Sequence, residues 1–155
     1  MQDQLEKYGS LAGRLAVAAI FVHSGLGKLG DLEATAAYVA ANGLPAPQLL
    51  ALLAGVVELV GGVALAVGLH SRWAAAALAA FLVPATVLFH NPAGLGAAAA
   101  HLQWIHVYKN LAIAGGLLAF TAFGAGPLAV EARPRKVREP GRLGFRSISE
   151  AAARS

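Results

Sequence analysis

Long runs of apolar residues alternate along the chain with short segments rich in glycine, proline and charged residues. Four of these runs reach the roughly 20 residues that a membrane-spanning helix needs. They cover residues 11–29, 47–69, 72–90 and 102–123. The runs are apolar around the whole helix and not along a single stripe, which is typical of membrane spans. The pattern therefore predicts an all-α fold, an integral membrane four-helix bundle.

The segment between the first two spans is more polar and predicts a short helix over residues 31–42. Asp31 is suited to cap its N-terminus, and Asn42 followed by Gly43 is suited to end it. The helix is too short to cross a bilayer, so we expect it to lie flat at the membrane interface. A solvated surface helix would show the same pattern.

Composition supports a membrane protein: 57% of the residues are hydrophobic and only 13% are charged. Residues 1–126 are predicted to form one membrane domain. Residues 127–155 are basic, and they are too few and too polar to fold alone, so a disordered cytoplasmic tail is expected. The net charge of +4 comes with no soluble domain, so nucleic acid is not an expected partner. The chain has no cysteine, which excludes disulfides and thiolate metal sites.

Lysine and arginine are unevenly distributed over the two sides of the predicted bundle. With the N-terminus in the cytoplasm, ten of the twelve basic residues fall on the cytoplasmic side, and only Lys28 and Lys109 lie toward the other side. Because basic residues beside membrane spans favour the cytoplasm, both termini are expected there. The basic tail is then placed to touch anionic lipid head groups.

Glu58 lies in the middle of the second span, ~16 Å from its start at Pro47 and close to the midplane of a ~30 Å hydrocarbon layer. An ionised carboxylate at this depth costs several kcal/mol unless it is paired, protonated or facing water. Arg14, Lys28 and Lys109 are the bases in the other spans, and together with Glu58 they form a candidate structural charge network. Matched depth favours Lys109 as the partner, and the other two remain alternatives.

Most other polar residues of the spans are predicted to lie in the outer half of the bundle, away from the cytoplasm. His23 and Lys28 lie near the end of the first span, and His90 ends the third. The fourth span begins with a polar group: His101, Gln103, Trp104, His106, Tyr108, Lys109 and Asn110.

These residues also have purely structural explanations. Arg14 and Lys28 lie near span ends, where long basic side chains extend their charges to the membrane surface. His90 and His101 fit interfacial positions, and Trp104 and Tyr108 fit an aromatic belt. The depth of Glu58 and Lys109 leaves a buried ion pair or a ligand site as their main roles.

A quinone is the ligand that this layer fits best, because its head group needs hydrogen-bond donors and its tail needs an apolar channel. His106, Lys109 and Asn110 are the predicted donors, with Glu58 nearby as a proton partner. A b-type haem would need two facing histidines from His23, His90 and His106. A zinc site would use the same histidines with Glu58, but no HxxxH or HExxH motif supports it. We regard both metal sites as the weaker hypotheses. The candidate ligand residues are therefore Glu58, His106, Lys109, Asn110, His23 and His90.

Four segments in order resemble the DoxX family of small bacterial and archaeal membrane proteins. They are GRLAVAAIFVHSGLGKL (13–29), AYVAANGLPAP (37–47), LAGVVELVGGVALAVGLHSRWAA (53–75) and KNLAIAGGLL (109–118). The resemblance covers about residues 10–125 and implies a four-helix bundle in the cytoplasmic membrane. It also implies a redox setting, since relatives include the membrane subunit of a thiosulfate:quinone oxidoreductase, and others associate with superoxide dismutase and a sulfurtransferase. The polar positions of the family pattern fall on Arg14, Lys28, Glu58, Lys109 and Asn110. The extra domain of the thiosulfate enzyme is absent from this chain, which argues against thiosulfate oxidation by this chain alone.

Two functions of different classes follow. The first is a redox-associated membrane protein that binds a quinone-like molecule, as a membrane subunit of an oxidoreductase complex. The alternative is a non-catalytic membrane anchor or scaffold for soluble redox enzymes. A small carrier or channel is disfavoured, because four spans leave little room for a pore unless the chain forms a homo-oligomer. The expected partners are therefore the lipid bilayer, soluble redox subunits and a second copy of the chain.

Overall fold

The computed structural model describes residues 2–131. They form helices and no strand, which confirms the all-α prediction. The elements are α1 (Gln2–Gly30), α2 (Leu32–Ala41), α3 (Pro47–Val67), α4 (Ser71–Phe89) and α5 (Ala97–Phe123). Residues 132–155, most of the predicted tail, lie outside the described residues.

Among the described residues, α1, α3 and α4 are long and apolar enough to cross a membrane. This agrees with an integral membrane helical bundle. α5 contains the fourth predicted span and has 27 residues, which is ~40 Å of helix, but it is not one of the three. The polar residues in the first half of α5 lower the mean hydropathy of the fourth predicted span below that of the other three. Those side chains need partners in the protein or at the interface.

Two helices begin earlier than the apolar pattern predicts. α1 starts at Gln2 and α5 at Ala97, whereas the predicted spans start at residues 11 and 102. The residues added to α1 include glutamine, leucine, glutamate and lysine, and all four are good helix formers. Hydrophobicity marks where a span begins, and helix propensity extends each helix beyond that point.

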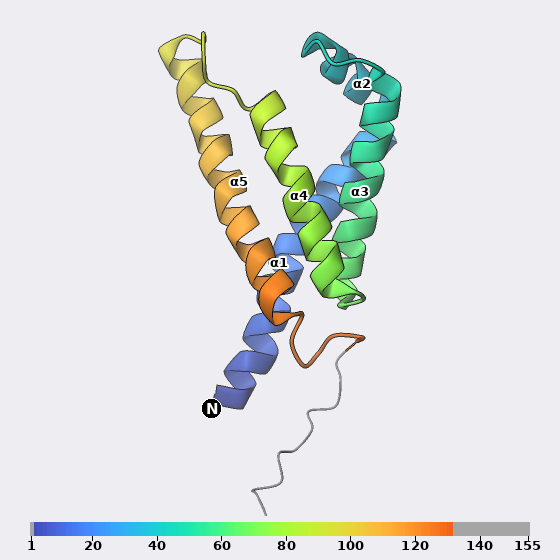
Figure 1. Cartoon of the computed structure of the whole chain (residues 1–155), viewed down its shortest axis with the longest axis vertical. Coiled ribbons are helices and arrows are strands. Elements are labelled where there is room, and N and C mark those ends of the chain that lie inside the picture. The colour runs from blue at the N-terminus through green and yellow to red at the C-terminus, as the bar shows by residue number, and fades with distance from the viewer. Residues whose placement is uncertain (1, 132–155) are drawn as a thin grey trace, which may run out of the picture.

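The long helices form two pairs that spread apart toward one end (Figure 1). α1 packs against α3 and α4 packs against α5, while α3 and α4 are joined by a short turn at the end where the pairs converge. α2 packs on α3 at the spread end. We call this the α2 end, and we call the end with the α3–α4 turn the opposite end.

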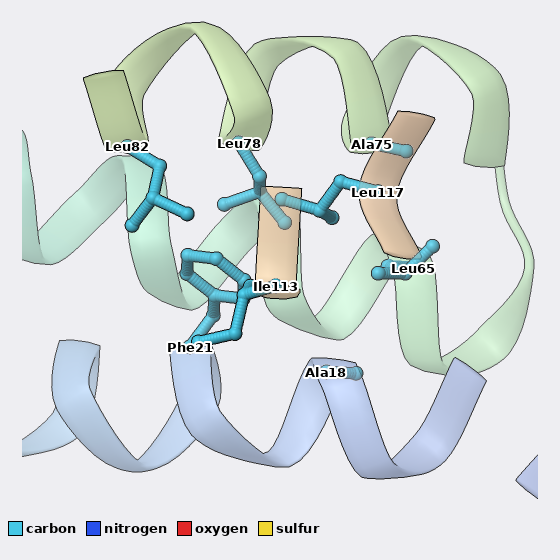
Figure 2. Packing of buried hydrophobic residues seen from close by; sticks show 8 residues of the cluster. All are labelled: Ala18, Phe21, Leu65, Ala75, Leu78, Leu82, Ile113 and Leu117. Atoms are coloured by element: carbon cyan, nitrogen blue, oxygen red, sulfur yellow. The ribbon is translucent and has the colours of Figure 1, made fainter. Parts of the chain in front are cut away.

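A buried cluster joins the four long helices where they converge, and Figure 2 shows side chains from each of them pointing into it. Its members are Ala18, Phe21, Leu65, Ala75, Leu78, Leu82, Ile113 and Leu117. Lipid tails are as apolar as these side chains, so close packing holds such a cluster together more than the hydrophobic effect does.

The contact between α1 and α3 is close because glycines lie on both helices. A Cβ atom added to Gly25 would come within 2.6 Å of the Leu59 backbone nitrogen and 2.9 Å of the Gly55 carbonyl oxygen. A Cβ atom on Gly62 would lie 3.0 Å from the backbone nitrogen of Val22. The absence of side chains therefore sets the distance between these two helices.

α2 confirms the short helix predicted between the first two spans. The Asp31 carboxylate accepts a hydrogen bond from the Ala34 backbone N–H at 3.0 Å, which makes it the N-cap, and Asn42 is the C-cap. Tyr38 stacks on Phe89 at the end of α4 with 5.4 Å between the ring centroids. α2 is thus linked to α4 as well as packed on α3.

The chain continues past residue 126, the predicted end of the domain, and turns back over the opposite end. The Val130 N–H donates to the Val67 carbonyl oxygen (3.1 Å), and the Glu131 N–H donates to that of Gly68 (3.2 Å). The Glu131 carboxylate accepts from the Ser71 backbone N–H at 2.8 Å and from the Ser71 hydroxyl. The hydroxyl bond is the main reason that the pKa of Glu131 lies below its ordinary value. An ionised carboxylate at the first turn of α4 also suits the helix dipole.

Candidate functional site

A cleft of about 380 Å³ lies between the helices toward the α2 end, and all five helices contribute to its lining. Most of the lining is apolar. The main polar contributors are Ser24 and Lys28 from α1, Glu58 from α3, His90 after α4, and Lys109 and Asn110 from α5. An apolar cavity with a few convergent polar groups is typical of a small-molecule site.

A larger hollow of about 1180 Å³ lies at the opposite end, bordered by the start of α1, the α3–α4 turn and residues 124–131. Its charged side chains belong to exposed or partly exposed residues of both signs. We place the candidate site in the smaller cleft, because its lining includes an ion pair formed by Lys28 and the buried Glu58.

Glu58 pairs with Lys28 across the contact of α1 and α3. The Lys28 Nζ atom donates to Glu58 Oε2 at 2.7 Å and to the Ser24 hydroxyl at 2.6 Å. Glu58 is buried with 7% of its surface exposed, while 30% of the Lys28 side chain is exposed. Lys28 is therefore held in the protein and does not simply extend its charge to the membrane surface.

Lys28 is one of the three predicted partners of Glu58, and the preference for Lys109 among them is wrong. It compared the depths of the two residues along their own helices. The pairing is decided by which helices touch: α1 lies directly against α3, and the Lys28 Cβ atom is 3.4 Å from where a Cβ atom on Gly55 would be. The flexible lysine stem then carries the ammonium to Glu58.

Arg14 lies apart from the Lys28–Glu58 pair, at the opposite end. Its guanidinium is buried and donates to the carbonyl oxygens of Ala125 (2.9 Å) and Leu128 (3.2 Å). The Ser10 hydroxyl donates to the same Ala125 oxygen at 2.8 Å. Arg14 thus fastens the segment after α5 to α1, and the predicted four-residue charge network is not one cluster.

Lys109 and Asn110 line the α5 wall of the cleft. Lys109 is exposed there, so the buried ion pair with Glu58 that its depth predicted is not formed. The Lys109 Nζ atom lies 3.4 Å from Nδ1 of His106. Asn110 is buried, and its Nδ2 atom donates to the Thr86 hydroxyl at 2.9 Å. That hydroxyl donates in turn to the Leu82 carbonyl oxygen at 2.7 Å, so Asn110 ties α5 to α4 beside the cleft.

The predicted histidines take different positions. His90 lines the cleft, with its Nδ1 atom 3.0 Å from Gln103 Oε1. His106 is not in the lining; its ring stacks on His90 with 4.7 Å between the centroids. His23 is exposed on α1, and His101 is exposed at the start of α5. Of the six candidate ligand residues, Glu58, His90, Lys109 and Asn110 meet at the cleft.

The two metal-centre hypotheses fit this arrangement poorly. Two axial haem ligands have to approach the iron from opposite faces of one porphyrin. His90 and His106 instead stack directly on each other. Within residues 2–131, no three side chains of the metal-binding types histidine, aspartate or glutamate come together.

Some residues of the cleft were not predicted from the sequence. Ser24 accepts from Lys28, and its position four residues earlier on the same helix face was a usable signal. Thr35 and Tyr38 also line the cleft. They belong to α2, and the sequence does not indicate how this short helix folds over the bundle.

Comparison with known proteins points to one family. The sequence matches the family model described as DoxX over residues 9–91. Inner membrane protein YphA of Escherichia coli strain K12 is 28% identical over 123 residues, which cover 79% of this chain and 88% of that protein. Inner membrane protein YqjF of the same strain is 29% identical over 128 residues, which cover 83% of this chain and 93% of that protein. No solved structure matches the sequence.

Proposed function

The chain belongs to the DoxX family, and we propose that this membrane protein binds a quinone-like, lipid-soluble molecule in the cleft at the α2 end. The observation that carries the proposal is the composition of the cleft. Largely apolar walls surround polar side chains from α1, α3 and α5, together with His90 after α4. A quinone needs this combination, because its carbonyl oxygens accept hydrogen bonds while its tail stays in an apolar medium.

The proposed arrangement assigns different parts of the ligand to different walls. Lys109 and Asn110 on α5 carry N–H groups for the carbonyl oxygens, with His90 beside them. Ile20, Leu50 and Leu88 line the cleft and are also exposed at the surface of the bundle. In a bilayer these side chains meet lipid, so they offer the tail an apolar route into the cleft. The redox association follows from the ligand: a protein that holds a quinone in the inner membrane is suited to serve a quinone-linked oxidoreductase.

Titration with a short-tailed quinone tests the proposal. We expect the purified protein in nanodiscs to bind it, and we expect Lys109→Ala or His90→Ala to weaken binding about tenfold, since a hydrogen bond to a charged or desolvated group contributes about 1.5 kcal/mol. Isothermal titration calorimetry measures the affinity. His101→Ala is the matched control, because His101 is exposed outside the cleft.

The quinone content of protein purified from the membrane provides a second test. We expect quinone to be extracted with the wild-type protein and to be depleted in Lys109→Ala. Protein that carries no quinone, and that added quinone neither binds nor stabilises, would refute the proposal. The membrane anchor for soluble redox enzymes would then be the better account.

We also propose that both termini lie in the cytoplasm. Lys7 and Arg72 border the hollow at the opposite end and Arg14 lies close to it, whereas Lys28 and Lys109 line the cleft toward the α2 end. Alkaline phosphatase, which is active only outside the cytoplasm, is expected to be active when inserted at Gly94 and inactive when fused after Ser155. An active fusion at Ser155 would reverse the orientation.

A further inference from the structure

Among residues 2–131, the cleft carries one positive charge that no acid in its lining balances. The part of the chain that the structure describes contributes one carboxylate to the lining, Glu58, and two lysines, Lys28 and Lys109. With all three side chains ionised, the net charge of the lining is one positive unit. Because Lys28 lies 2.7 Å from Glu58, the excess charge belongs to Lys109.

Lys109 and Glu58 lie on helices of different pairs. Glu58 and Lys28 lie on α3 and α1, and Lys109 lies on α5, which belongs to the other helix pair. The polar contact found for the Lys109 ammonium is Nδ1 of His106 at 3.4 Å. Lys109 is exposed on α5, and the histidine nitrogen beside it accepts a hydrogen bond but supplies no negative charge. This contact therefore leaves the charge of the ammonium uncompensated.

We infer that the cleft recognises a ligand whose head group is anionic, and specifically a hydroxyquinone in its ionised form in preference to a neutral quinone. This inference rests on the proposed quinone site and adds to it the charge state of the ligand. The ionised hydroxyl of such a ring shares its negative charge with the ring carbonyls. It therefore supplies the counter-ion that the described residues do not give to Lys109.

Lys109 and Asn110 are suited to bind a ligand head group that has two adjacent oxygen atoms. Lys109 is placed to bind the ionised oxygen, and Asn110 is the next residue on the same wall. The Asn110 amide nitrogen carries two hydrogens and gives one to Thr86, which leaves the other for a carbonyl oxygen. The Lys28–Glu58 pair has no net charge, so it neither strengthens nor cancels the attraction between Lys109 and the anionic ligand.

Two ligands with the same ring and tail, one anionic and one neutral, provide the test. One is an alkyl 2-hydroxy-1,4-naphthoquinone, which is ionised at neutral pH, and the other is its 2-methoxy ether, which is neutral and has the same ring and tail. We expect the wild-type protein in nanodiscs to bind the hydroxyquinone at least tenfold more tightly by calorimetry. Lys109→Gln is expected to remove this preference. Lys7→Gln changes a lysine at the opposite end and is expected to retain it.

Each outcome separates this inference from the proposed function. Equal affinity for the two naphthoquinones would overturn the charge preference and leave the quinone site standing. Binding of neither compound would overturn the quinone site itself. A straight-chain carboxylate of the same tail length is expected to bind more weakly than the hydroxyquinone. If it binds as tightly, the cleft recognises any amphipathic anion, and the hydroxyquinone assignment is wrong.

Discussion

Replacing Glu58 with alanine is expected to lower the free energy of unfolding by about 3 kcal/mol, because it strands the Lys28 ammonium in the bundle. The Lys28 Nζ atom now lies 2.7 Å from Glu58 Oε2, and Glu58 is 7% exposed. The expected loss is at the low end for a buried pair, since 30% of the Lys28 side chain is exposed and the charge keeps some access to the membrane surface. Denaturation of the purified protein in mixed micelles, followed by circular dichroism, measures it.

A double-mutant cycle identifies the partner. The variant Glu58→Ala/Lys28→Ala is expected to be more stable than the sum of the two single changes predicts, because removing both charges leaves neither one stranded. Lys109→Ala is the matched control, and its effect should add to that of Glu58→Ala. Coupling of Glu58 to Lys109 in place of Lys28 would contradict the structure.

The helices and the kind of protein were predictable from the sequence, because both depend on local patterns. Apolar runs locate the cores of α1, α3 and α4, and Asp31 marks the start of α2 through its own side chain. The beginnings of α1 and α5 were not predictable from the membrane spans, because helix propensity extends both helices beyond the start of the span.

The partner of Glu58 was not predictable, because it depends on which helices are neighbours. Counting residues gives depth along one helix, but it does not show that Gly55 and Gly25 let α1 lie against α3. The position of Arg14 has the same cause. Its acceptors are backbone carbonyl oxygens of Ala125 and Leu128, and a carbonyl group leaves no signature in the sequence.

The orientation of His23 was within reach of sequence reasoning. Successive residues of a helix are turned by about 100°, so His23 and Lys28 point in different directions, whereas Ser24 and Lys28 share a face. Once Lys28 is assigned to the interior, His23 therefore belongs on the surface, where the structure has it. His23 was predicted to be a ligand residue because only its depth along the helix was considered.

Gly25→Ala is expected to destabilise the protein by about 2 kcal/mol or more, because a methyl group there meets backbone atoms that cannot rotate away. The new Cβ atom would lie 2.6 Å from the Leu59 nitrogen and 2.9 Å from the Gly55 oxygen. Gly27→Ala, two residues along the same helix, has nothing within 4 Å of its Cβ position and is the matched control. It is expected to leave stability unchanged or raise it by up to about 1 kcal/mol, as alanine favours helix over glycine. Denaturation in mixed micelles compares the two variants.

The expected effects of Glu58→Ala and Gly25→Ala are coupled, because both changes lie at the contact of α1 and α3. A methyl group at Gly25 relieves its overlap with Leu59 and Gly55 only if the helices move apart, and Lys28 and Glu58 lie on these same helices. The pair should therefore contribute less to stability in the Gly25→Ala background, so that Glu58→Ala costs less there than in the wild type. The Gly27→Ala background should retain the full cost. An undiminished effect of Glu58→Ala beside Gly25→Ala would mean that the helices accept the methyl group without separating, and that close approach is not what holds the ion pair together.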